Sequence, residues 1–180
     1  MPGTAPLAPM ILAAVALFST CAERPPSAPS GSPDASGMGR LTILLTDHHL
    51  DGVQEVHVWI HGISTELRGG GVISFDRQLG DVELLSLHGE SIEVVNNVVP
   101  SGTYEYVELG IDESRSRIVE SGLTKTLSVP AGSARVRGPF EVRAGESTTI
   151  TLDFDAEKSL SRLPDGSWAL DPVVVVKESG

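Results

Sequence analysis

The sequence has one cysteine, few aromatic residues and few basic residues. A lone cysteine cannot form an intramolecular disulfide or a cysteine-based metal site. Aromatic residues make up only 4% of the chain, so a core must rest on Val, Leu and Ile, which favour strands when they occur in short runs. Lys and Arg number 13 against 24 Asp and Glu. Because a nucleic-acid site needs a basic surface to neutralise phosphates, nucleic acid is not an expected partner.

The first residues have the pattern of a bacterial export signal. The apolar run at 7–18, LAPMILAAVALF, is about the length of a signal-peptide core and too short to span a bilayer. It leads into residues 17–21 (LFSTC), which resemble a lipobox, where a signal peptidase cuts before a cysteine that becomes diacylated. We therefore expect residues 1–20 to be a lipoprotein signal peptide and Cys21 to be the lipid attachment site. A plain secretory signal with an incidental cysteine is the alternative.

The segment that follows has almost nothing to bury. Residues 21–39 are rich in Pro, Ser, Gly and Ala, a composition typical of a disordered tether. Such a tether would hold a folded domain away from a membrane, which becomes a partner through lipidated Cys21. Ala22 rather than Asp follows the cysteine, a pattern associated with the outer membrane in bacteria that have two membranes. The expected location is thus exported and lipid-anchored in a bacterial cell envelope, on the outer membrane where one exists.

Residues 40–178 read as a single β-sandwich domain. Along 54–60, Val56, Val58 and Ile60 face one way, whereas His57, Trp59 and His61 face the other, which indicates a strand with one buried side. Residues 140–143, a turn at 144–146 and residues 147–155 predict a hairpin. Eight or nine strands of this kind, with no long helical period, predict an all-β fold, an antiparallel β-sandwich.

The order of several motifs resembles that of a known family. The matching stretches include VQEVHVWIHG (53–62), VPSGTY (99–104), LSVPAG (127–132), GPFEVRAG (138–145) and LDFDAEKS (152–159). Together they are similar to domain-of-unknown-function family 4382, a family of bacterial and archaeal lipoproteins. The resemblance implies a prealbumin-like or immunoglobulin-like sandwich and implies no activity. The chain departs from the family at His48 and His49, where Ala-Pro is frequent.

The outward-facing side chains of the strand at 54–60 form one candidate ligand-binding site. Trp59, flanked by His57 and His61, can stack on a sugar ring or anchor a protein partner if it lies on an open sheet face. The alternative is that residues 69–75 cover Trp59 and give it a structural role. The two histidines are about 13 Å apart on a strand, which is too far for them to chelate one ion together.

A weak calcium site is the second candidate. Asp153 and Asp155 lie two apart on one predicted strand, about 7 Å from each other, and Asp47 or Asp51 could complete a set of carboxylate ligands. The alternative is a solvated outer face with a turn acid. No other cofactor is expected, and the chain lacks a phosphate-binding glycine loop. It also lacks the nucleophile elbow of a serine hydrolase.

These features predict a lipid-anchored envelope protein that is not an enzyme. Its sandwich would be a binding or structural module for an envelope polysaccharide or a surface protein. A calcium-stabilised adhesion or glycan-binding domain is one alternative. A small hydrolase that uses carboxylates is another, and it would require a deep pocket with converging acids.

Overall fold

The computed structural model describes residues 37–47 and 50–179. The predicted signal peptide, Cys21, most of the predicted tether and the pair His48-His49 lie outside the described residues. The described residues form one compact unit, which contains twelve strands, one short α-helix, α1 (Ala156–Ser159), and one 3-10 turn at Leu85–Leu87. No helix in this part of the chain has the length and apolar character needed to cross a membrane.

The first sheet has four strands in the order β12-β9-β1-β5. Their bounds are β1 (Met38–Asp47), β5 (Ile92–Pro100), β9 (Ser147–Phe154) and β12 (Val174–Ser179). β1 lies inside the sheet, paired antiparallel with β5 on one side and parallel with β9 on the other. β12 completes the sheet antiparallel to β9.

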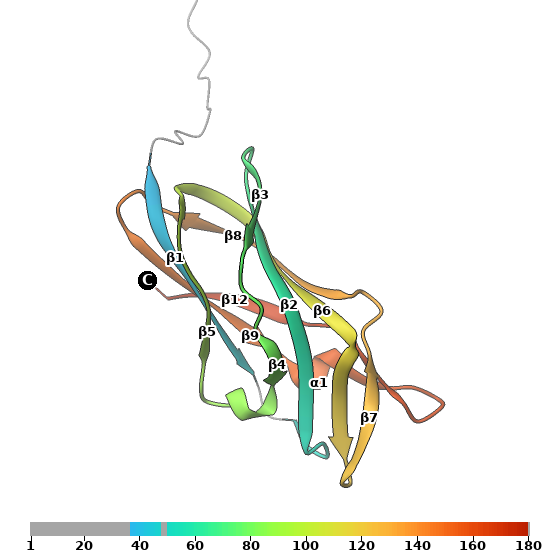
Figure 1. The fold of residues 1–180 in the computed structure, drawn as a ribbon. Helices are drawn as coiled ribbons and strands as arrows, with labels where there is room; N and C mark the ends of the chain where they lie inside the picture. Colours follow the sequence, from blue (N-terminus) through green and yellow to red (C-terminus); the bar gives the residue numbers. More distant parts are fainter. Residues whose placement is uncertain (1–36, 48–49, 180) are drawn as a thin grey trace, which may run out of the picture. The chain divides into compact units, whose positions relative to one another are not determined.

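The second sheet is organised around two long antiparallel strands, β2 and β6, which run side by side in Figure 1. Each has two partners along its outer edge: β3 and β4 pair with β2, and β8 and β7 pair with β6. β11 pairs parallel with β7, and β10 pairs with β11. The bounds are β2 (Glu55–Leu67), β3 (Gly71–Phe75), β4 (Gly80–Glu83), β6 (Gly102–Glu120), β7 (Leu123–Ser128), β8 (Ser133–Val142), β10 (Leu160–Arg162) and β11 (Trp168–Leu170).

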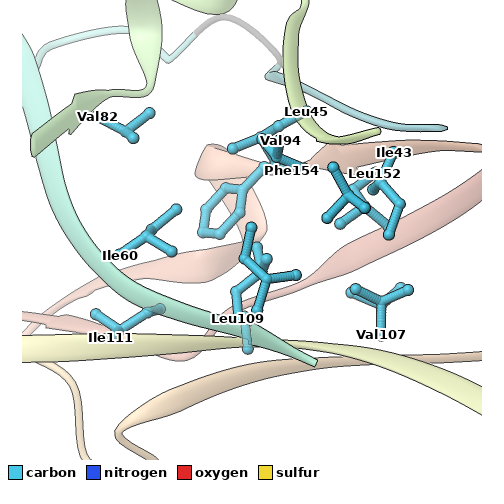
Figure 2. Close-up of a cluster of buried hydrophobic side chains, with 14 of the residues drawn as sticks. Ile43, Leu45, Ile60, Val82, Val94, Val107, Leu109, Ile111, Leu152 and Phe154 are labelled. Carbon is cyan, nitrogen blue, oxygen red and sulfur yellow. The ribbon is translucent and has the colours of Figure 1, made fainter. Parts of the chain in front are cut away.

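The core lies between the two sheets. Alternate side chains of each strand are buried in one hydrophobic cluster, as period-two alternation requires. In Figure 2, Phe154, Leu152 and Ile43 of the first sheet face Leu109 and Ile60 of the second. Aliphatic residues form most of the cluster, with Tyr104, Phe75, Phe140 and Phe154 as its aromatic members. The predicted β-sandwich is confirmed, and the low aromatic content is reflected in this mainly aliphatic interior.

The Pro-x-Gly-x-Tyr turn of the sequence locks one end of β6 into the core. Tyr104 is fully buried, its hydroxyl donates a 2.6 Å hydrogen bond to the carbonyl of Pro100, and its ring stacks on Phe140 with 5.2 Å between centroids. A Tyr that bonds backbone a few residues upstream is a recurring device of β-sandwiches. Burial raises the pKa of the Tyr104 phenol to about 12.

The structure corrects three details of the predicted architecture. The sheets are mixed rather than wholly antiparallel, and the described strands number twelve rather than eight or nine. The predicted hairpin at 140–155 is wrong, because β8 pairs with β6 in the second sheet whereas β9 pairs with β1 and β12 in the first. The turn at 144–146 therefore carries the chain from one sheet to the other.

The start of the domain also differs from the expected boundary. β1 begins at Met38, so residues 38 and 39, assigned above to the tether, lie in a strand. The carbonyl of Met38 accepts a 2.8 Å hydrogen bond from the amide of Gly145. Gly39 is buried so close to the backbone of Arg143 that a Cβ there would lie 2.3 Å from its carbonyl oxygen. These contacts place Met38 and Gly39 within the folded domain.

Candidate binding face on the second sheet

A wide bulge in β6 builds the site around Trp59. His57 of β2 pairs with Arg117 of β6, and Trp59 pairs with Asp112. Between these two pairs β2 has one residue, whereas β6 has four, 113–116. The hydroxyl of Ser116 closes this bulge, accepting a 3.1 Å hydrogen bond from the amide of Trp59 and donating to the carbonyl of Asp112 at 2.8 Å. The extra backbone projects outward and places the guanidinium of Arg115 over the Trp59 ring, 3.6 Å from its centroid.

His57 lies in a charged cluster beside this stack. Its ring nitrogens lie 2.9 Å from a carboxylate oxygen of Glu55 and 3.1 Å from one of Asp81. Arg117 donates a 2.8 Å hydrogen bond to the other oxygen of Asp81. Burial opposes ionisation of Asp81, but the hydrogen bond from Arg117 and the positive charge of His57 outweigh it, so the pKa of this carboxyl lies below its ordinary value. Only 14% of the His57 side chain is exposed, so it is largely engaged within the sheet surface.

His61 is exposed on the same outer face. Its ring lies over Gly110 of β6, where an added Cβ would be 2.6 Å from a ring carbon. The pKa of the nearby Asp112 carboxyl is lowered, first by a hydrogen bond from Ser114 and further by the charges of Arg115 and His61. The structure thus brings His57, Trp59 and His61 to one face, as their alternation predicts, but each histidine has its own surroundings.

The segment expected to cover Trp59 lies elsewhere. β3 pairs with residues 63–67 of β2, in the plane of the sheet and away from the ring. Arg115 covers the face of Trp59 instead, and a Cβ at Gly80 of β4 would lie only 3.7 Å from the ring edge. Trp59 is therefore half-buried by a cation and a neighbouring strand, and not by the loop at 69–75.

Sequence reasoning missed a second part of this face. A pocket of about 520 Å³ lies where β2, β6 and β8 meet, lined by Glu66, Glu105, Tyr106, Arg135, Arg137 and Pro139. A bulge between Tyr104 and Tyr106 turns Tyr106 outward while Tyr104 stays in the core. Arg135 lies over the Tyr106 ring, 4.3 Å from its centroid, and forms an ion pair with Glu108 at 2.5 Å. The spacing of Arg135 and Arg137 by two residues was the available signal, because it places both on one strand face.

The carboxylates of the predicted calcium site are not brought together. Asp47 pairs with Phe154, whose side chain is in the core, whereas Asp153 pairs with Thr46 and faces the other side of the first sheet. Asp47 accepts a 3.3 Å hydrogen bond from the amide of Ala156, and Asp153 forms an ion pair with Lys177. Asp155 caps α1 by accepting a 3.0 Å hydrogen bond from the amide of Lys158. Asp51, the alternative to Asp47 as the third acid, is exposed in the loop before β2.

The separate partners of these acids explain why their spacing in the sequence did not predict their arrangement in the fold. Two strand residues two apart share a face only while the strand continues, and β9 ends at Phe154, so Asp155 already belongs to a helix cap. Within residues 37–47 and 50–179, no group of three or more His, Cys, Asp or Glu side chains is arranged to hold a metal ion.

Comparison with known proteins places the fold in a family without giving it an activity. No curated protein and no solved structure matches the chain. A family model described as "Domain of unknown function (DUF4382)" matches residues 38–172, from the first residue of β1 to the loop before β12. That match covers every described strand except β12, together with the β6 bulges and the outer face described above, and it agrees with the resemblance seen in the ordered motifs. The chain belongs to the DUF4382 family.

Proposed function

We propose that this protein is exported, lipidated at Cys21 and anchored in a bacterial cell envelope, where its sandwich is a non-catalytic binding module for a surface polymer. The anchor is supported by the apolar run at 7–18 and the lipobox-like residues 17–21. The observation that carries the binding role is the outer face of the second sheet. There, two aromatic rings, Trp59 and Tyr106, each lie beneath an arginine on rigid paired strands.

Such a face suits recognition of an extended ligand. Aromatic and arginine side chains supply flat contact area and directional donors, and they are enriched where proteins bind partners. The bulges that present them also fix their positions, because Ser116 ties the Trp59 strand to the β6 bulge. A glycan or another envelope protein lying across β2, β6 and β8 would meet both stacks.

The carboxylates of this face support binding rather than hydrolysis. Asp81 is held by Arg117 and Asp112 by Ser114, and these partners favour the charged forms of the two aspartates. Glu108 forms an ion pair with Arg135. A carboxylate hydrolase needs one acid kept protonated next to a second acid across a cleft. The arrangement of these three acids therefore favours electrostatic positioning of a ligand over proton transfer.

The anchor is tested by intact mass spectrometry of the full-length protein made in a bacterial host. A mature chain that begins at Cys21 and carries acyl chains is the expected product, and Cys21→Ala should lose both the processing and the membrane fraction. An unmodified chain cut at another position would contradict the lipid anchor and leave a secreted protein.

The binding role is tested by co-sedimentation of the protein with purified envelope polysaccharide and with cell-wall sacculi. Arg115→Ala and Tyr106→Ala should reduce the bound fraction severalfold, because each removes half of one stack. Val98→Ala is the matched control, since Val98 is 55% exposed on β5 of the other sheet. Equal sedimentation of all four proteins would show that this face is not the binding surface.

A further inference from the structure

The pocket between β2, β6 and β8 has a composition that points to one kind of ligand. It is lined by two arginines and two glutamates around the edge of one aromatic ring. Its volume of about 520 Å³ is within the range of small-ligand sites, roughly 300–1,000 Å³. From this lining we infer that the pocket is a subsite for a carboxylate-bearing sugar, a uronic acid unit of an envelope polysaccharide. The inference rests on the proposed binding role of this face and names its ligand.

The two arginines differ in what they already bind. Arg135 is committed, because it stacks on Tyr106 and donates two hydrogen bonds to Glu108, at 2.9 and 2.5 Å. Arg137 lies two residues further along β8 and so projects to the same side. Among the described residues, Arg137 has no hydrogen-bond or ion-pair partner. Its guanidinium is thus available in the pocket wall for bidentate binding of a planar carboxylate.

The glutamates define what surrounds that carboxylate. Glu66 of β2 and Glu105 of β6 line the same pocket, and Glu105 is already oriented by an ion pair with Arg68. Ionised carboxylates only accept hydrogen bonds, so they match the hydroxyl groups of a sugar and repel further negative charge. A ligand with one carboxylate and several hydroxyls on each ring can pair its carboxylate with Arg137 and donate its hydroxyls to the two glutamates.

This mixed lining argues against densely charged ligands. A nucleic acid, a polyphosphate or a run of acidic residues would place several negative charges close to Glu66 and Glu105. The whole chain carries a formal net charge of −11, which adds long-range repulsion of such polymers. The edge of the Tyr106 ring and the apolar surface of Pro139 offer the pocket an apolar contact for the sugar ring itself.

The conformation of β8 explains why a pocket forms here. Arg137 pairs with Tyr106 and Phe140 pairs with Tyr104, so the ladder slips across the intervening residues. Gly138 takes a φ of 152° and Pro139 has no amide to donate, so neither residue continues a regular ladder. The slip lets Phe140 return to the core, stacked on Tyr104, while the side chains of Arg135 and Arg137 remain on the outer face.

Calorimetric titration of the purified full-length protein with disaccharides tests the inference. The probes are digalacturonate, the corresponding glucuronate and mannuronate disaccharides, and digalactose as the neutral counterpart. At least one uronate should bind about tenfold or more tightly than digalactose, because a hydrogen-bonded ion pair with Arg137 is absent from the neutral sugar. Arg137→Gln should reduce the affinity for that uronate to the level of digalactose.

Arg40→Gln is the matched control. Arg40 is an exposed arginine of β1 in the first sheet, hydrogen-bonded to Asn96 at 2.7 Å, and its replacement should leave uronate affinity unchanged. Equal affinity of uronate and neutral sugar, unchanged affinity in Arg137→Gln, or no binding of any uronate would overturn the subsite. Tighter binding of a short Asp-containing peptide would also overturn it in favour of a protein ligand. None of these results would affect the co-sedimentation test, which decides the binding role separately.

Discussion

Tyr104 and Tyr106 show how differently the two sides of the second sheet use the same residue. They lie two apart on β6 and would share a face in a regular strand, but the bulge between them sends Tyr104 into the core and Tyr106 to the outside. Tyr104 contacts groups that hold the fold together, among them its partner ring Phe140 and the Pro100 carbonyl. Tyr106 lies beneath a cation in a pocket open to solvent. The inner side of the sheet is packed into the core, whereas the outer side carries charged and aromatic side chains that a ligand can reach.

Truncating the two tyrosines should give the largest difference between these sides. Tyr104→Ala leaves a cavity beside Phe140 and should lower the free energy of unfolding by about 3–5 kcal/mol. Tyr106→Ala removes a ring that lies under Arg135 at the surface and should cost about 1 kcal/mol or less. Urea denaturation of both variants measures the two values. Similar losses would mean that the outer face contributes to the fold as much as the core does.

Substitution of two glycines should show the same contrast between the core and the outer face, with smaller losses of stability. In Gly39→Ala the new Cβ meets the carbonyl oxygen of Arg143 at 2.3 Å, and backbone cannot move away without disturbing the link between the sheets. We expect a loss of about 1–3 kcal/mol. In Gly110→Ala the obstacle is the exposed ring of His61, which can rotate, so the loss should stay below about 1 kcal/mol. Thermal denaturation of the pair provides the comparison, and a larger loss for Gly110→Ala would contradict it.

The smallest effect concerns one oxygen atom and depends on pH. Tyr104→Phe keeps the ring but removes the hydrogen bond to Pro100, which should cost about 1 kcal/mol at neutral pH. The phenol has a pKa of about 12 in the fold against 10.0 ordinarily. Its contribution is therefore fully present below pH 10.0 and is lost as the pH rises toward 12.

Urea denaturation of wild type and Tyr104→Phe from about pH 9 to about pH 12 isolates this group, because all other titrating groups are common to both proteins. The stability difference should shrink across that window and then favour the variant. A difference that stays constant with pH would show that the Tyr104 phenol has the same pKa in the folded and unfolded states.

Local alternation made much of this fold predictable. Residues 56–61 follow strict period two, so the inward set of Val56, Val58 and Ile60 and the outward set around Trp59 were correctly separated. The family resemblance rested on ordered motifs that span both sheets, and it is confirmed. These features depend on residues close together in the chain, where side-chain period and turn chemistry leave few alternatives.

The features that could not be predicted from the sequence depend on which strands pair with each other. The turn at 144–146 has the composition of a hairpin, but β8 and β9 already have partners in different sheets, and no local signal reports that. The bulge at 113–116 is defined only by the register of β6 against β2. The pocket joins Glu66, Tyr106 and Arg137 from three strands, so its assembly could not be read from any one segment.

The place of β1 within the first sheet has a mechanical consequence. β1 is the first described strand, and it is held by β5 along one edge and by β9 along the other. A pull applied through the residues before Met38 would load β1 lengthwise, so that the hydrogen bonds of both ladders share the shear instead of opening one after another. Under such a load the domain would resist peeling apart from its first strand.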